Sequence, residues 1–206
     1  MSTETAILLA AERLFAVEGI GATSLRRIGK AAGQRNTAAV QYHFTGKDEL
    51  IRAVFRHRQE VIGARRRELL RALEGERPAG PRGLVEALVR PLAEQAARPG
   101  SHYVRFLHRV FEHTGHDTAA LSEISGLDEA AAIGGLLADR LPFLAEPGCR
   151  FRPRWAGRLI ITSLADLEQR LTAPGAPDPE EFATALTDAA TGLLTAPPTP
   201  PPGPAQ

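Results

Sequence analysis

Apolar residues recur along most of the chain with the spacing of about 3.6 residues that is typical of amphipathic helices. Residues 4–18 predict a first helix, and two short helices are expected at about 25–32 and 37–43. A long helix should begin after residue 46 and end near 73, with further helices near 84–97, 101–114, 153–171 and 179–194. Residues 119–145 also favour helix, without clear boundaries. Runs that alternate strictly between apolar and polar residues are absent, so an all-α fold is predicted.

The stretch from Thr23 to Lys47 has the pattern of a helix-turn-helix. We expect Thr23 to cap the first short helix, whose apolar stripe includes Ile28. Gly33 follows the last apolar position, where a glycine commonly ends a helix in a left-handed conformation. The polar residues that come next supply a turn and a second, short helix. In such motifs the second helix enters the major groove of DNA.

Three groups of residues at fixed spacing make this stretch specific: Ala31-Ala32-Gly33, Tyr42-His43-Phe44 and Lys47-Asp48-Glu49-Leu50. Over about residues 5–55 the chain resembles the DNA-binding domain of TetR-family transcriptional regulators. It departs from the commonest form by one extra residue between Gly33 and Phe44, which leaves the register of the turn open.

The resemblance implies an N-terminal three-helix helix-turn-helix DNA-binding domain, joined by a long helix to a C-terminal helical domain for ligand binding and dimerisation. On this basis we expect the DNA-binding domain at 1–46 and the ligand-binding and dimerisation domain at 47–195. Residues 196–206 are mostly proline and are expected to form a disordered tail. The last two helices would supply the dimer interface, unless their apolar faces only complete the core of the monomer.

Charge is distributed unevenly, although the net charge of the 206 residues is only +1. Residues 1–72 hold 13 basic and 7 acidic side chains, whereas the remainder holds 12 and 17. This asymmetry favours a DNA-facing N-terminal end. The single cysteine, Cys149, fits a reducing compartment, and the N-terminal apolar run is too short to span a membrane. We therefore expect a cytoplasmic protein with no membrane partner.

Candidate DNA contacts fall into two classes. Hydroxyl, aromatic and cationic groups that resemble the family's phosphate contacts would fix orientation, whereas side chains near the start of the second helix would contact base edges. The first class contains Thr23, Tyr42, His43 and Lys47, with Arg27 and Lys30 as further backbone candidates; the second contains Arg35, Asn36, Thr37 and Gln41.

A second cluster of aromatic and polar residues lies in the C-terminal half. Its bulky members could line an apolar cavity that holds a small molecule with a few polar groups, although core packing explains each of them equally well. The ligand-binding candidates are Tyr103, Phe106, His108, Phe111, Glu112 and Trp155. His108, Glu112 and His116 follow i, i+4, i+8 and could bind a divalent metal on an unbroken helix, but Gly115 is expected to end that helix first.

These observations predict a homodimeric DNA-binding regulator, most simply a repressor, that binds a palindromic double-stranded operator and is released by an unknown small-molecule effector. We expect no catalytic residues, bound metal or cofactor, because the candidate residues for an enzyme include no nucleophile, no phosphate-binding loop and no firm set of metal ligands. Two alternatives stay open: a metal-dependent helical enzyme, and a DNA-organising protein indifferent to sequence.

Overall fold

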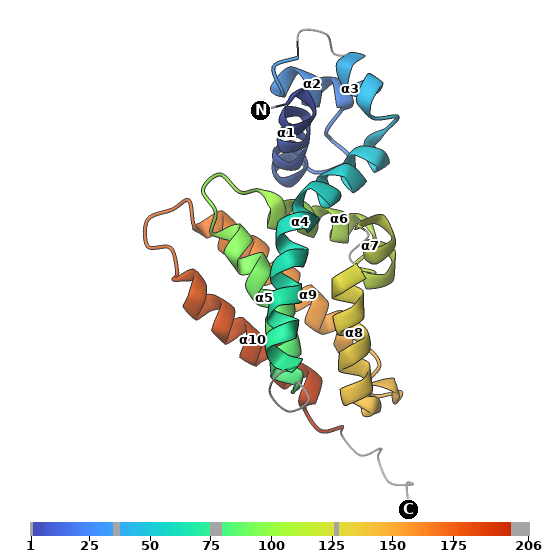
Figure 1. The fold of residues 1–206 in the computed structure, drawn as a ribbon, viewed down its shortest axis with the longest axis vertical. Helices are drawn as coiled ribbons and strands as arrows, with labels where there is room; N and C mark the ends of the chain where they lie inside the picture. The colour runs from blue at the N-terminus through green and yellow to red at the C-terminus, as the bar shows by residue number, and fades with distance from the viewer. Residues whose placement is uncertain (1, 35–37, 75–79, 126–127, 199–206) are drawn as a thin grey trace, which may run out of the picture.

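A computed structural model describes residues 2–34, 38–74, 80–125 and 128–198, and every regular element among them is a helix (Figure 1). The all-α prediction is confirmed, and the predicted helices agree with the observed bounds to within one turn. The elements are α1 (Thr3–Glu18), α2 (Leu25–Ala31), α3 (Ala38–His43), α4 (Lys47–Glu74), α5 (Pro81–Ala96), α6 (Tyr103–His113), α7 (Thr118–Ser125), α8 (Asp128–Arg140), the 3-10 turn η1 (Pro142–Ala145), α9 (Arg152–Arg170) and α10 (Pro179–Thr195).

The N-terminal helices α1, α2 and α3 pack around a small core to which the first turns of α4 also contribute. Ile7, Phe15, Ile28, Val40 and Leu50 are fully buried there. Because α2 and α3 are too short to be stable alone in water, this shared core fixes their orientation.

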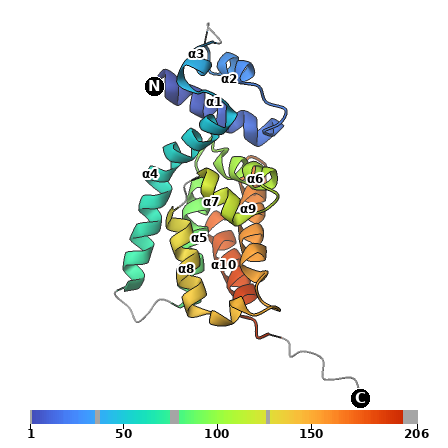
Figure 2. The same cartoon turned by 90° about the vertical axis from the view of Figure 1, so that its right-hand side faces the viewer.

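Helix α4 connects the two ends of the molecule. Its 28 residues correspond to a rod of roughly 42 Å at 1.5 Å per residue. The first half buries Ile51 and Val54 and packs on α1, and the second half runs alongside the C-terminal body, in contact with α5, α7 and α8 (Figure 2). A displacement of this helix would therefore be transmitted to both parts.

The C-terminal body is built around α5, which contacts α4, α6, α8, α9 and α10 (Figure 1). A proline inside a helix removes one backbone hydrogen bond, yet α5 continues through Pro91, which is buried. The segment whose boundaries the sequence left undefined contains α7, α8 and η1.

The start of α6 is stabilised from another helix. Its N-cap position is His102, whose side chain makes no capping hydrogen bond. Instead, the buried carboxylate of Glu168 on α9 accepts hydrogen bonds from the backbone N–H groups of Val104 (3.2 Å) and Arg105 (2.9 Å). A negative group at a helix N-terminus is favourable, so α9 fixes the end of α6 through a long-range contact that helix periodicity does not reveal.

The N-terminal helices are also anchored directly on the C-terminal body. One aromatic cluster joins the two parts: it contains Phe15 of α1, Phe55 of α4, and Tyr103 and Phe106 of α6, and the ring centroids of Phe55 and Phe106 are 5.0 Å apart.

None of the helices within the described ranges is long and apolar enough to cross a bilayer. The predicted disordered tail falls mostly outside the described residues, which end at 198.

Candidate nucleic-acid interface and apolar cavity

The turn between α2 and α3 begins as the sequence predicts. Gly33 has a φ of 72°, the left-handed conformation that ends a helix at low cost only when the residue is glycine. Residues 35–37 lie outside the described residues, and so do the predicted base contacts Arg35, Asn36 and Thr37. The side chain of Gln41, the fourth predicted base contact, is likewise outside the description, although its backbone belongs to α3.

Thr23 does not fit either of its predicted roles. The hydroxyl that accepts a hydrogen bond at the start of α2 is that of Ser24, from the Arg27 backbone N–H at 3.2 Å. Thr23 is fully buried, and its hydroxyl donates to the carbonyl oxygens of Gly19 (2.9 Å) and Leu14 (3.4 Å). The hydroxyl therefore secures the turn between α1 and α2 and is not available to a DNA phosphate in this conformation.

The end of α3 presents two exposed rings. Tyr42 is 87% exposed, an unusual position for a tyrosine, and its ring packs edge-on against the exposed ring of His43 at 5.4 Å. The next residue, Phe44, turns inward and is buried. The Tyr-His-Phe group therefore serves two purposes: it anchors the end of α3 in the core and leaves a phenol and an imidazole facing solvent.

Cationic groups lie near these rings, but they are partly engaged. The ammonium of Lys47 donates to the carbonyl oxygens of Ile20 (2.9 Å) and Gly21 (3.2 Å). The guanidinium of Arg27 is paired with Glu18 at 2.6 Å and is 60% exposed. An ammonium group carries three donors and a guanidinium five, so each keeps capacity for a phosphate.

The first turn of α4 is fixed by Glu49. Its carboxylate accepts hydrogen bonds from the backbone N–H of Thr45 (2.6 Å) and from the hydroxyl of the same residue (2.7 Å). These hydrogen bonds lower the pKa of Glu49, with smaller contributions from Arg56 and Arg52. The acidic residue of the Lys-Asp-Glu-Leu group thus stabilises the corner at which α3 passes into α4.

An ion pair between α1 and α4 lies just behind this interface. The guanidinium of Arg58 donates to both carboxylate oxygens of Glu12, from Nε at 2.7 Å and from Nη2 at 2.9 Å. Glu12 is only 2% exposed, so this ion pair compensates for the hydration that its carboxylate loses on burial. The pair fixes the position of α1 on the long helix.

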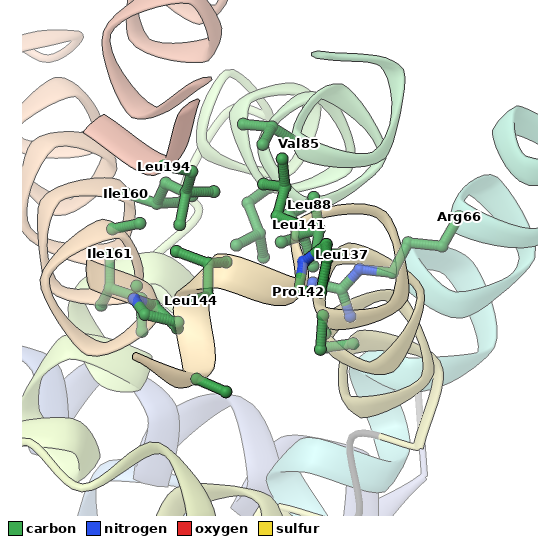
Figure 3. Close-up of a pocket in the computed structure, with 18 of the residues that line it drawn as sticks. Arg66, Val85, Leu88, Leu137, Leu141, Pro142, Leu144, Ile160, Ile161 and Leu194 are labelled. Atoms are coloured by element: carbon green, nitrogen blue, oxygen red, sulfur yellow. The ribbon is translucent and has the colours of Figure 1, made fainter. Parts of the chain in front are cut away.

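A cavity of about 420 Å³ lies inside the C-terminal body, mainly between α5, α8 and α9 (Figure 3). Its size falls within the roughly 300–1,000 Å³ that is usual for sites that hold small molecules. Apart from Arg66 of α4, the described residues that line it are aliphatic, proline or glycine. They are Val85, Leu88, Leu92, Leu107, Ala130, Gly134, Leu137, Ala138, Leu141, Pro142, Leu144, Ala145, Pro153, Ala156, Gly157, Ile160, Ile161 and Leu194.

Arg66 is the one charged residue of this lining. It is 2% exposed, and its Nε and Nη1 atoms have no hydrogen-bond partner among the described residues. Burial lowers the pKa of its guanidinium, and the nearby Tyr103 and Glu129 oppose this shift only in part. Figure 3 shows the side chain extending from α4 into the cavity beside Leu137.

None of the six predicted ligand-binding residues lines this cavity. Tyr103, Phe106 and Phe111 are fully buried in the core, and Trp155 is 53% exposed and stacks on Phe151. Three of these residues therefore complete the core, which was the alternative to a place in a cavity wall, and the fourth lies on the surface.

The two polar candidates lie elsewhere. His108 lines a separate, polar cavity of about 440 Å³ between α1, α6 and α9. Burial lowers the pKa of its imidazole, and the neighbouring Glu112 opposes this shift. The carboxylate of Glu112 is exposed and paired with Arg109 at 2.9 Å. Neither side chain lies in the apolar cavity.

The metal alternative gains no support from the geometry. As predicted from Gly115, helix α6 ends before His116, whose φ of 60° places it off the helical path. Its ring packs edge-on against Phe111. Among the described residues, no group of three or more His, Cys, Asp or Glu side chains is arranged to hold a metal ion.

The cavity residues could have been found in part from the sequence. Arg66 follows Ile62 by four residues and precedes Leu69 and Leu70 by three and four, so it shares their face of a helix. An arginine on an apolar helix face indicates a buried cation. Arg66, however, lies in a run of three arginines, which resembles a solvated surface. The rest of the lining comes largely from α8 and η1, whose bounds the sequence did not define.

Comparison with known proteins gives a match in the N-terminal part. Residues 7–54 match the family model described as "Bacterial regulatory proteins, tetR family". No curated protein matches the chain.

Among solved structures, a mutant of the protein HlyIIR is similar with a TM-score of 0.57 and 19% identity, covering 95% of this chain and 98% of that one. A tetR-family bacterial regulatory protein from Rhodococcus RHA1 gives 0.56 and 18%, covering 94% and 97%. A transcriptional regulator from Rhodococcus sp. Rha1 gives 0.55 and 21%, covering 94% and 96%. These likenesses extend over nearly the whole chain and establish the fold.

Proposed function

From the match of residues 7–54 to the family model of tetR-type bacterial regulatory proteins, we propose that the chain is a homodimeric repressor of this family. In this proposal each subunit places α3 in the major groove of a palindromic operator, and a small molecule in the apolar cavity releases the DNA. The observation that carries the proposal is the exposed Tyr42-His43 pair at the end of a short helix in a helix-turn-helix.

Phosphate contacts would come from the ends of the motif. Tyr42, His43, Lys47 and Arg27 present hydroxyl, imidazole and cationic groups that suit phosphate oxygens. Base contacts would come from Arg35, Asn36, Thr37 and Gln41, since arginine pairs with guanine, asparagine and glutamine pair with adenine, and threonine contacts the thymine methyl. A symmetric dimer would repeat this set about one helical turn of DNA, roughly 34 Å, or a multiple of it, away.

We place the dimer interface on the last two helices. Ala185, Ala189 and Gly192 lie on the exposed side of α10 at spacings of four and three residues, and such small side chains permit close approach of a second helix. Light scattering should give a mass of about twice 22.1 kDa.

Replacement of Ala189 with arginine should shift the protein to a monomer, because a long charged side chain would have to be buried between the helices. Alanine at position 72, exposed on α4, is the matched control, and A72R should remain a dimer. A dimeric A189R would place the interface elsewhere.

The cavity would hold the effector. It lies against α4, the helix that also packs under the DNA-binding helices. A ligand in the cavity would therefore bias the positions of the DNA-binding helices in both subunits. A ligand releases DNA only if it binds the released conformation more tightly than the DNA-bound one. The preference has to amount to about 5.5 kcal/mol if the switch is to go from 1% to 99% released.

Repression is tested by placing a genomic fragment that the protein retains ahead of a reporter gene. Expression of the protein should lower reporter output, because a dimer on the promoter excludes polymerase. An increase in output would identify an activator and would contradict this part of the proposal. Equal retention of genomic and random duplexes at the same salt concentration would favour a DNA-organising protein instead.

A further inference from the structure

Arg66 differs from the arginines on either side of it. Arg65 pairs with Glu94 at 3.0 Å, and Arg67 pairs with Glu129, both at the surface of α4. Arg66, by contrast, points into the body, and two of its nitrogen atoms have no hydrogen-bond partner among the described residues. The three consecutive residues thus comprise two paired surface cations and one buried cation without a partner.

A buried guanidinium without a partner is unfavourable for a physical reason. Arginine is protonated at any ordinary pH, so it cannot escape burial by releasing its proton as a lysine does. Buried charges in proteins are otherwise paired, hydrogen-bonded or bound to an ion. The charge of Arg66 therefore calls for an anion, and the cavity of about 420 Å³ beside it has room for one.

The remainder of the cavity wall is apolar. Leu88 of α5, Leu137 of α8, Leu144 of η1 and Ile160 of α9 surround the space into which Arg66 extends (Figure 3). Such a wall suits an aliphatic body, whose burial is favourable in proportion to its apolar area. With one cation in the described lining, the cavity matches one anionic group and not two.

We propose that this cavity binds an apolar molecule with a single carboxylate, held with the carboxylate against Arg66 and the aliphatic part among the leucines of α5, α8 and η1. The assignment rests on the proposed function in taking this molecule as the effector. Carboxylates suit a guanidinium because the bonds between them are charge-assisted and match its planar donors.

The position of Arg66 also links the carboxylate of the ligand to the DNA-binding end of the protein. Arg66 lies two helical turns after Arg58, which holds Glu12 of α1 in the buried ion pair. A carboxylate drawn to Arg66 therefore acts on the same rigid helix that positions α1. The effector's charged group, and not only its apolar volume, contributes to the switch.

The test measures binding of octanoate, decanoate and dodecanoate, and of the alcohols of equal length, to the full-length protein at neutral pH by titration calorimetry. The wild type should bind the best carboxylate about tenfold to a hundredfold more tightly than its alcohol, which is the range expected for a hydrogen bond to a charged group. Arg66→Met keeps the volume and removes the charge, so the preference should disappear while the alcohol still binds.

Two further variants complete the test. Arg66→Lys keeps a positive charge and should retain part of the preference. Arg71→Met removes a charge from an exposed site on the same helix and should behave as the wild type. Because Arg66→Met removes an unpaired buried charge, it should fold at least as well as the wild type, and alcohol binding reports that its cavity is intact.

The outcomes separate this inference from the function on which it rests. A carboxylate preference that depends on Arg66 supports the inference, even if the bound protein still holds DNA; in that case ligand release is the part that fails. Absence of a carboxylate preference in the wild type, or its persistence in Arg66→Met, overturns the inference. Operator binding measured without ligand is independent of either result.

Discussion

Replacing Tyr42 with phenylalanine is expected to weaken DNA binding at least about 100-fold on every duplex that the protein binds. The substitution removes one hydroxyl and nothing else, and a hydrogen bond to a charged acceptor contributes about 1.5–3 kcal/mol. A dimer carries two copies, so the loss is at least about 3 kcal/mol. Since Tyr42 is 87% exposed, the stability of the free protein should not change.

Salt dependence distinguishes this hydroxyl from the neighbouring cation. Tyr42→Phe leaves the slope of log K against log salt unchanged, because no charge is lost. Lys47→Gln should reduce the slope by about 1.8, because each lost phosphate contact reduces it by roughly 0.9 and the dimer loses one contact in each subunit. Arg71→Gln, the same change of charge at the far end of α4, should leave both affinity and slope unaltered. Fluorescence anisotropy at several salt concentrations measures the affinity and slope of all three variants. Wild-type affinity in Y42F and K47Q would show that neither residue contacts DNA.

Replacing Glu12 with glutamine is expected to lower the free energy of unfolding by about 3 kcal/mol. Loss of one partner from a buried ion pair typically costs about 3–5 kcal/mol, because the other charge is left without compensation. The lower end applies here, since the side chain of Arg58 is 17% exposed and recovers some hydration. Urea denaturation at one fixed protein concentration provides the measurement, because dimerisation would make stability depend on concentration.

A matched control lies on the same helix. Glu18 forms an exposed ion pair with Arg27, so Glu18→Gln should cost less than about 1 kcal/mol. The double variant Glu12→Leu/Arg58→Met removes both charges and should recover most of the loss. If E12Q and E18Q were equally stable, the buried pair would not be a principal link between α1 and α4.

The fold could be predicted because its determinants are local in the sequence. Apolar spacing located the helices, and Gly33 marked the end of α2 because its positive φ is a property of one residue. Thr23 and Ser24 show the limit of such inference: both are good caps, and only the packing of Thr23 beneath α1 determines that Ser24 has that role. The start of α6 likewise depends on Glu168, which lies more than sixty residues away.

The cavity could not be predicted in the same way. Tyr103, Phe106 and Phe111 were chosen for their size, but large aromatic rings fill cores as readily as they line cavities, and these three complete a core. The actual lining consists of aliphatic side chains and Arg66, gathered from helices distant in sequence. Which of three consecutive arginines is buried follows from the helical face that it shares with Ile62 and Leu70, once the bounds of α4 are known.

Two copies of α3 in a dimer should recognise a symmetric DNA sequence. The most direct test is selection of bound duplexes from a random pool by the full-length protein at one near-physiological salt concentration. Our account predicts enrichment of a palindrome whose half-sites are separated by about one helical turn, or a multiple of it. Recovery of sequences with no common motif, from protein shown to be folded and dimeric, would contradict it.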